Sequence, residues 1–209
     1  ENTEGVCSDV YDIIQARSDR LSFILMDVAG KGTNSFLVMS MIRAMIRLVV
    51  NTTQSAGTIL SWTNRGICGE INFEHFASAA LINFNPATKK VQLSTAGTTP
   101  VYLYSVAKDT VERKSITCDP IGVEKTASYK DIEFTASQGD IIITFTDGMV
   151  EALNADGKQY SVERLTSIIK TNNKLSGKEI SDLIKKDIKK FIGNEALHDD
   201  QTLLVVKIQ

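Results

Sequence analysis

Residues 20–32 read RLSFILMDVAGKG, a short apolar run followed by a turn of small residues. The run over 20–28 has the length of a buried β-strand, and AGKG over 29–32 ends it. Asp27 stands at the end of this strand, where apolar surroundings do not favour a carboxylate. Gly30 and Gly32 allow a tight turn from which a helix can start. The stretch therefore predicts a strand that holds an acidic side chain rigidly at its end.

Two helices are predicted after this turn, from Asn34 to about Val50 and from about Gly57 to Asn72, because apolar residues recur there at helical spacing. In the first helix the residues expected to face the core are Leu37, Met41, Ala44 or Met45, and Leu48. In the second helix they are Ile59, Trp62, Ile67 and Ile71. The apolar stretch over 36–50 contains two arginines, so it is too short and too charged to span a bilayer.

The middle of the chain changes to strand patterns separated by turn residues. Strands are predicted over 76–84, 90–95, 100–106, 110–117, 128–135 and 140–146, with a last strand over 201–208. Turn signals such as Asn85-Pro86 and Gln138-Gly139 lie between neighbours. These short links indicate antiparallel sheets.

The helical period returns between the last two strands. Ser161 and Ser176 are predicted N-caps of two helices, and Gly193 is predicted to end the second. The order of strand, two helices, many strands, two helices and strand places a helix pair on each side of the sheets. We therefore expect an α+β fold, a four-layer α/β/β/α sandwich, with residues 1–209 forming one domain.

Composition narrows the class of protein. The 209 residues are 43% hydrophobic and 23% charged, as in ordinary globular domains. The net charge of −2 gives no electrostatic argument for nucleic acid, and we expect no nucleic-acid partner. The three cysteines are far apart and form no CxxC pair, which fits a reducing, cytoplasmic compartment. The chain begins with Glu1 rather than Met, so we expect it to be part of a longer protein.

Acidic residues gather at the predicted strand ends. Asp27 and Asp147 each end an apolar strand, Asp199 and Asp200 precede the last one, and Asp9 lies in the opening segment. A single Asp-Gly pair at a strand end often makes only a turn. Several converging carboxylates would repel one another, and a hard divalent cation such as Mg²⁺ or Mn²⁺ would relieve that repulsion. The repetition therefore favours a metal site.

The motifs resemble those of the SpoIIE/RsbU-type branch of the bacterial PPM (PP2C-like) phosphatases. DVAGKG over 27–32 resembles D-V-S-G-H-G, and HDDQTLLVVKI over 198–208 resembles D-D-x-T-L-L-V-x-K. The long stretch over 139–165 resembles G-D-x-L-x-x-Y-T-D-G-x-x-E-A-x-N. The opening VCSDVYD over 6–12 is similar to V-G-G-D-Y-Y-D, with Cys7-Ser8 in place of Gly-Gly. The motifs occur in family order over nearly the whole chain.

The resemblance implies a role for each matching residue. Asp27 would bridge two metal ions, Mn²⁺ or Mg²⁺, together with the backbone carbonyl of Val28. Asp9 would complete the shell of one ion, and Asp147 and Asp199 would bind the other. Asp27 and Asp147 are thus the expected catalytic residues, through the metal ions that they hold. Asp200 would support the site without binding metal.

The implied reaction is hydrolysis of phosphoserine or phosphothreonine on a regulatory protein by metal-activated water. The resemblance further implies a phosphorylated anti-sigma-factor antagonist as substrate and an upstream sensor domain in the full chain. It leaves room for a homodimer and for a membrane-anchored parent protein.

Two other functions stay open from the sequence. The first is a regulatory or binding domain that keeps the fold but has little or no turnover, and Cys7-Ser8 is the feature that favours it. The second is another two-metal phosphohydrolase, such as a nuclease or a small-phosphomonoester hydrolase. A phosphopeptide assay with Mn²⁺ would separate the three.

Overall fold

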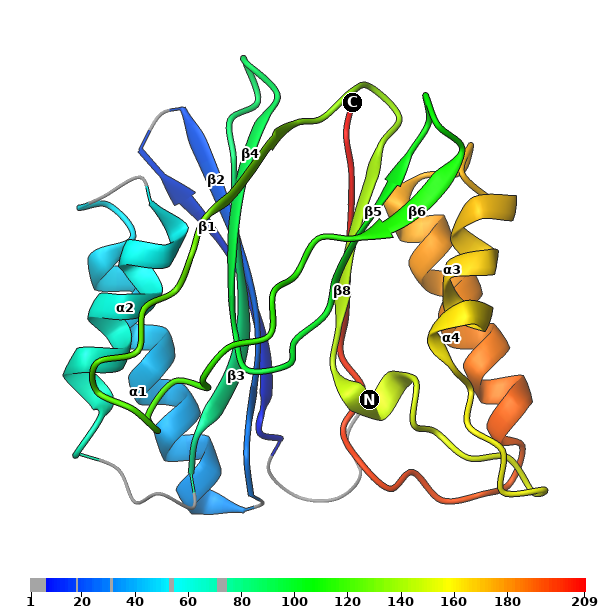
Figure 1. Ribbon diagram of the computed structural model, residues 1–209. Helices are drawn as coiled ribbons and strands as arrows, with labels where there is room; N and C mark the ends of the chain where they lie inside the picture. Colours follow the sequence, from blue (N-terminus) through cyan, green and yellow to red (C-terminus); the bar gives the residue numbers. More distant parts are fainter. Residues whose placement is uncertain (1–6, 18, 31, 53–54, 71–74) are drawn as a thin grey trace.

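The protein is built from four layers, as its computed structural model shows (Figure 1). The structure describes residues 7–17, 19–30, 32–52, 55–70 and 75–209. In this part of the chain, two antiparallel sheets pack face to face and a pair of helices covers the outer face of each. The predicted α+β, α/β/β/α sandwich is therefore confirmed.

The two sheets have different strand orders. The first has the order β1-β2-β3-β4-β7. Its strands are β1 (Asp9–Ala16), β2 (Arg20–Val28), β3 (Ala77–Phe84), β4 (Lys90–Ala96) and β7 (Ile132–Thr135). The second has the order β6-β5-β8-β9. Its strands are β5 (Val101–Ser105), β6 (Thr110–Arg113), β8 (Ile141–Phe145) and β9 (Leu203–Lys207).

Each interface between layers has its own apolar core. The sheets contact each other through residues such as Phe23 and Ile82 on one side and Leu103 and Ile142 on the other. The first sheet packs against α1 (Thr33–Val49) and α2 (Ala56–Ile67), and the second against α3 (Val162–Thr171) and α4 (Gly177–Ile192). Because both faces of each sheet are covered, the central strands are apolar along most of their length.

Alternation along β2 decides where its polar ends point. Ile24 and Met26 belong to the core beneath α1 and α2, whereas Phe23 belongs to the core between the sheets. Successive side chains of a strand point to opposite faces. Asp27 therefore points toward the second sheet, and Arg20, at the other end of the strand, points toward the helix layer.

Some strands differ from the sequence prediction. β1 was not predicted as a strand, although it pairs with β2 along its whole length. Tyr11 and Ile13 on this edge strand are apolar although they are 59% and 51% exposed. The sequence of β1 therefore lacks the alternation of apolar and polar residues that marks a half-buried strand. The strands predicted over 110–117 and 128–135 are shorter, ending at Arg113 and starting at Ile132.

The inward face predicted for the first helix is wrong. Leu37, Met41 and Leu48 are exposed, and the buried apolar side chains of α1 are Val38, Met39, Ile42 and Ile46. Helix α1 is apolar on two faces, and tertiary packing selects the second one. In α2, Ile59 and Ile67 are buried as predicted, Trp62 is 45% exposed, and Ile71 lies outside the described residues.

The later helices begin where they were predicted to begin. Ser161 accepts a hydrogen bond from the Arg164 amide at α3, and Ser176 forms a full capping box with Glu179 at α4. Gly193 follows α4 with a positive φ. Among the described residues, no helix combines the length and the apolarity needed to cross a bilayer.

Candidate metal centre

Asp9 and Asp27 face each other across two neighbouring strands. They are direct partners in the antiparallel register of β1 and β2. Cross-strand partners bring their Cβ atoms to about 5 Å, on the same face of the sheet. The strand pairing therefore places both carboxylates together between the sheets, with Cys7-Ser8 preceding Asp9. That these two residues bind metal in one site stays a prediction.

Asp147 and Asp199 come from the second sheet. Asp147 begins the short 3-10 helix η1 (Asp147–Met149) directly after β8, and Asp199 lies before β9. A Cβ atom on Gly148 would lie 2.2 Å from the Asp200 carbonyl oxygen and 3.2 Å from the Asp199 Cβ atom. Only glycine therefore lets these two segments touch. The contact holds Asp147 and Asp199 at the same end of the sandwich.

Burial and neighbouring carboxylates raise the pKa values of Asp9, Asp27 and Asp147. Burial, followed by the charges of Asp9 and Asp199, raises the pKa of Asp27 to about 7, and Asp147 adds to the shift. Burial also raises the pKa of Asp9, although hydrogen bonds from Thr146 and Thr202 oppose it. Burial and the Asp199 charge raise the pKa of Asp147. We call Asp9, Asp27, Asp147 and Asp199 the Asp cluster.

Hydrogen bonds from neighbouring strands position the buried part of the Asp cluster. The Thr146 hydroxyl donates to Asp9 Oδ2 at 2.8 Å and accepts from the Thr202 amide at 3.0 Å. Asp200 is buried, and its Oδ2 accepts from the Ser8 amide at 3.3 Å. Asp200 therefore ties the segment before Asp9 to the segment before β9. This contact agrees with a supporting role rather than a ligand role.

The donor set of the Asp cluster suits a hard divalent cation. Among the described residues, no lysine or arginine forms an ion pair with any of its four members. Within that same part of the chain, no three His, Cys, Asp or Glu side chains form a ready-made metal cage. Mg²⁺ keeps several of its waters and usually binds through one or two carboxylates, so a spread carboxylate set fits it. The oxygen donors thus fit Mg²⁺ or Mn²⁺ with water completing the shell.

Val28, His198 and Lys31 belong to the motifs that resemble the family and lie as follows. Val28 is buried at the end of β2, and its amide donates to the Ser8 carbonyl, while its carbonyl stays a predicted ligand. His198 is exposed and, with Asp199, lines a pocket of about 250 Å³. Lys31 lies outside the described residues.

Two residues near the Asp cluster were not predicted as site residues from the sequence. Thr146 was assigned only to a strand, because threonine is a common strand residue and carries no signal of a polar partner. Arg113, at the end of β6, has a positive charge that lowers the pKa of Asp147. Nothing in the spacing of the sequence joins β6 to the turn after β8. Only the pairing of both with β5 brings them together.

Comparisons with known proteins identify relatives of this chain. The model of the family described as Stage II sporulation protein E (SpoIIE) matches residues 17–209. The phosphoserine phosphatase RsbU of Bacillus subtilis (strain 168) is 26% identical over 204 residues, which cover 95% of this chain and 58% of RsbU. Protein IcfG of a Synechocystis strain is 21% identical over 99% of this chain and 36% of IcfG. The chain thus spans little more than half, or less, of these curated relatives.

Solved structures share the fold. The SiaA-PP2C domain of Pseudomonas aeruginosa has a TM-score of 0.86 and 18% identity, covering 98% of this chain and 82% of that one. The structure of the PP2C phosphatase domain of SpoIIE from Bacillus subtilis, with a fragment of its regulatory domain, has a TM-score of 0.83 and 16% identity. It covers 99% of this chain and 60% of that one. A fold shared with PP2C domains and a family match over most of the length lead to one conclusion: the chain is a PP2C-like domain that belongs to the SpoIIE family.

Proposed function

We propose that this domain is a divalent-metal-dependent protein serine/threonine phosphatase. The observation that carries the proposal is the Asp cluster, in which carboxylates from both sheets meet without a lysine or arginine ion-pair partner among the described residues. Such a cluster gains most from a bound cation. The match to the SpoIIE family and the name of RsbU, a phosphoserine phosphatase, support this reaction.

The proposed ligands divide between two ions. Asp27 would be the central ligand for Mn²⁺ or Mg²⁺, and the Val28 carbonyl would join it. Asp9 would complete the shell of one ion, and Asp147 and Asp199 would hold the other. When bound, such ions activate water as the nucleophile and neutralise charge on the phosphoryl group. A relative of the same fold, RsbX, was solved in complex with magnesium and has a TM-score of 0.76 and 19% identity, covering 100% of this chain and 92% of that one.

The chain's own residues would hold this arrangement. The Thr146 hydroxyl donates to Asp9 and so fixes which Asp9 oxygen remains for a ligand. Gly148 lets the Asp147 and Asp199 segments approach, and the Asp200 side chain anchors the Ser8 amide. The Arg113 charge lies close enough to act on Asp147, where it could also attract an anionic substrate. These residues orient and attract, and none of them needs to act as a nucleophile.

The finer parts of the proposal concern the substrate and its control. We propose a phosphorylated regulatory protein as substrate, of the anti-sigma-factor antagonist type, and the likeness to RsbU supports it. An upstream sensor domain, a homodimer and a cytoplasmic location also stay predictions. They would be checked on the full-length protein.

The decisive experiment measures Mn²⁺-dependent release of phosphate from a phosphoserine peptide. We expect turnover by the wild type and its loss in Asp27→Asn and Asp147→Asn. Asp182→Asn is the matched control, because Asp182 is exposed on α4 outside the Asp cluster. Circular dichroism would verify that each variant is folded.

Two results would favour the alternative functions. A folded wild type with no metal-dependent turnover, even at high Mn²⁺, would indicate a regulatory domain without catalysis. Turnover of nucleic acid or of small phosphomonoesters, but not of phosphopeptides, would indicate a different two-metal phosphohydrolase. Equal turnover in wild type and Asp27→Asn would contradict the assignment of the Asp cluster.

A further inference from the structure

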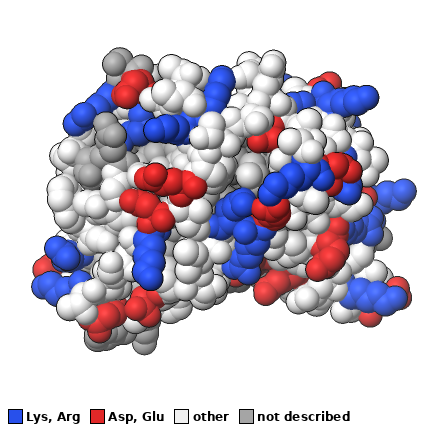
Figure 2. Space-filling view, turned by 45° about the horizontal axis from the view of Figure 1, so that its top comes forward, with Lys and Arg blue, Asp and Glu red and all other residues white. Residues whose placement is uncertain are grey.

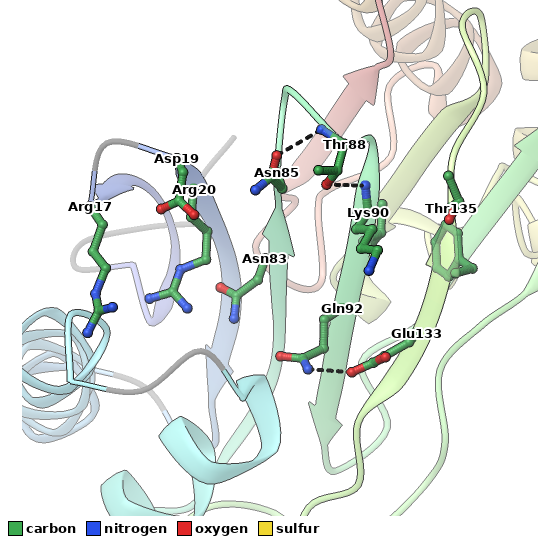
Figure 3. Close-up of a pocket in the computed structure, with 12 residues that line it drawn as sticks. Arg17, Asp19, Arg20, Asn83, Asn85, Thr88, Lys90, Gln92, Glu133 and Thr135 are labelled. Carbon is green, nitrogen blue, oxygen red and sulfur yellow. Dashed lines mark hydrogen bonds between the residues drawn. The ribbon is translucent and has the colours of Figure 1, made fainter.

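A polar pocket of about 370 Å³ lies on the helix-facing side of the first sheet. It is formed where β2 begins, where the β3–β4 hairpin turns and where β7 ends, which is the opposite end of the sheet from the Asp cluster (Figures 1 and 3). Arg17 and Arg20 line one side, Lys90 and Glu133 the other, and Asn83 lies between them. The apolar core beneath α1 and α2 does not extend here, so the sheet presents polar side chains.

Arg20 is the unusual residue of this pocket. It is only 7% exposed, and its Nη2 atom donates to the carbonyl oxygen of Val50, just after α1. Its Nε and Nη1 atoms are buried and have no hydrogen-bond partner among the described residues. A buried guanidinium normally has all of its donors satisfied. Two donor atoms of one cation thus stand ready for an acceptor that no described residue supplies.

No carboxylate of the described residues forms an ion pair that neutralises Arg20. Asp19 is exposed, and its charge acts on Arg20 only as a minor opposition to burial and to Arg17, which together lower the pKa of Arg20. Glu133 instead accepts a hydrogen bond from Gln92 at 2.7 Å. A buried cation without a counter-charge is costly, so an anion in the pocket would gain a strong interaction.

The basic residues around Arg20 are arranged to help an anion bind. Arg17 is fixed by hydrogen bonds to the Asn51 carbonyl from Nε and Nη2, and Lys90 has no ion pair among the described residues. The charged residues that line the pocket are three basic ones, Arg17, Arg20 and Lys90, and two acidic ones, Asp19 and Glu133. Figure 2, which brings the top of Figure 1 forward, shows basic and acidic side chains mixed over this face. Binding would therefore depend on local donors rather than on a broad positive field.

We propose that this polar pocket binds a small molecule that carries a phosphate or carboxylate group. The oxyanion accepts a hydrogen bond from one of the two unpartnered donor atoms of Arg20, Nε or Nη1, and Arg17 and Lys90 add positive charge around it. The amide side chains of Asn85 and Gln92 and the Thr88 hydroxyl line the remaining wall and suit a ligand with further polar groups. This site is separate from the Asp cluster and does not depend on the proposed phosphatase activity.

The test uses backbone amide NMR of the metal-free protein, titrated with inorganic phosphate and, separately, with malonate. We expect saturable shifts at the β3–β4 hairpin and at β7, with a dissociation constant of about 1 mM or tighter for at least one probe. Whichever probe binds identifies the oxyanion class. Metal-free protein keeps phosphate from binding through a metal ion at the Asp cluster.

Three variants assign the binding to this pocket. Arg20→Gln should weaken binding by about tenfold or more, because it removes the charged donors. Since Arg20 also holds the Val50 carbonyl, Lys90→Gln is the second variant, and it should weaken binding while leaving that contact in place. Lys125→Gln is the matched control, an exposed lysine outside the pocket, and it should bind like the wild type.

Two results would overturn the proposal. The first is the absence of saturable shifts at the pocket with both probes, which would mean that water satisfies Arg20. The second is binding that neither Arg20→Gln nor Lys90→Gln weakens, which would place the ligand elsewhere.

Discussion

The two ends of β2 carry opposite and uncompensated charges. At its first residue, Arg20 is a buried cation with two donors that no described residue satisfies. Near its last residue, Asp27 is a half-buried carboxylate surrounded by other carboxylates. The two residues are separated by seven strand positions, which is roughly 23 Å. One strand thus joins a site suited to a cation with a site suited to an anion.

A third charged group on the same sheet provides the reference for this comparison. Asp12 on β1 is buried like Arg20, yet it accepts hydrogen bonds from Arg43 at 2.9 Å and from Arg47 at 2.6 Å. The fold therefore supplies counter-charges where a buried charge serves packing, here the packing of α1 on β1. Where it supplies none, at Arg20 and in the Asp cluster, a bound ion of opposite charge is the physical remedy.

The largest expected effect comes from removing the charge at the acidic end. Asp27→Asn should reduce kcat/KM for a phosphopeptide by about 10³-fold, since a lost metal contribution of about 4 kcal/mol corresponds to that factor. The metal-free variant should unfold at the same temperature as the wild type or higher, because one charge leaves a repulsive cluster. Steady-state kinetics with Mn²⁺ and thermal unfolding in EDTA measure the two quantities. A strongly destabilised metal-free variant would show that Asp27 has a structural rather than a metal-binding role.

Asp12, which has arginine partners, should affect stability rather than activity. Asp12→Asn should lower the free energy of unfolding by about 2 kcal/mol, between the values for exposed and for fully buried ion pairs, because both arginines are partly exposed. Urea unfolding measures this loss, and it should be the same with and without Mn²⁺. A loss that depends on Mn²⁺ would show that Asp12 acts on the metal centre.

The pH dependence of the stability difference between the wild type and Asp12→Asn provides a second check of the Asp12 ion pairs. Burial alone would raise the pKa of Asp12, but hydrogen bonds and charge from Arg47 and Arg43 outweigh it and hold the pKa below its usual range. The stabilisation is therefore present above the unfolded-state pKa of about 3.9 and is lost as the pH falls through the lower folded-state pKa. The unfolding free energies of wild type and Asp12→Asn should converge in acid. Curves that stay parallel down to pH 2 would contradict the ion-pair explanation.

The sequence predicts the bounds of a strand well where both of its faces are buried, because the strand then reads as one continuous apolar run. β2 is buried on both faces, and its predicted bounds of 20–28 agree with the structure. β1 was missed because its outer residues Tyr11 and Ile13 are apolar yet exposed, so the period of two is obscured. Helix α1 was found, but its buried face was not, because two faces are apolar and only contact with β1 and β2 decides between them.

The candidate site was predictable only in part for a similar reason. Asp9, Asp27, Asp147 and Asp199 each belong to a motif with a turn or a strand end, so a local pattern marks them. Thr146, Arg113 and Arg20 have no such pattern. Their partners are 137 residues away for the Thr146–Asp9 bond and 30 for the Arg20–Val50 bond. Long-range pairing of strands, rather than local spacing, creates these contacts.

Thr146 and Thr144 form a matched pair of variants, because only the Thr146 hydroxyl donates to a residue of the Asp cluster. Thr146→Val removes the hydroxyl that donates to Asp9, and we expect it to weaken Mn²⁺ binding by about tenfold, as for other residues that orient a metal ligand. Thr144 is two residues earlier, and its buried hydroxyl has no partner among the described residues. Thr144→Val should therefore leave metal affinity unchanged and the protein as stable or more so. Calorimetric Mn²⁺ titration of both variants measures the contrast, and equal affinities would remove Thr146 from the site.

The smallest expected effects are the stabilisations produced by each ligand, and they test directly whether the two ends of β2 are separate sites. Mn²⁺ and inorganic phosphate, each added alone at about ten times its dissociation constant, should each stabilise the wild type by about 1.4 kcal/mol. In Asp27→Asn the Mn²⁺ effect should disappear and the phosphate effect remain, and in Lys90→Gln the phosphate effect should become smaller and the Mn²⁺ effect remain. Sites this far apart are expected to act independently, so the crossed pattern separates two sites from one. If Asp27→Asn abolished both effects, phosphate would bind at the acidic end, and the two ends of β2 would not be distinct ligand sites.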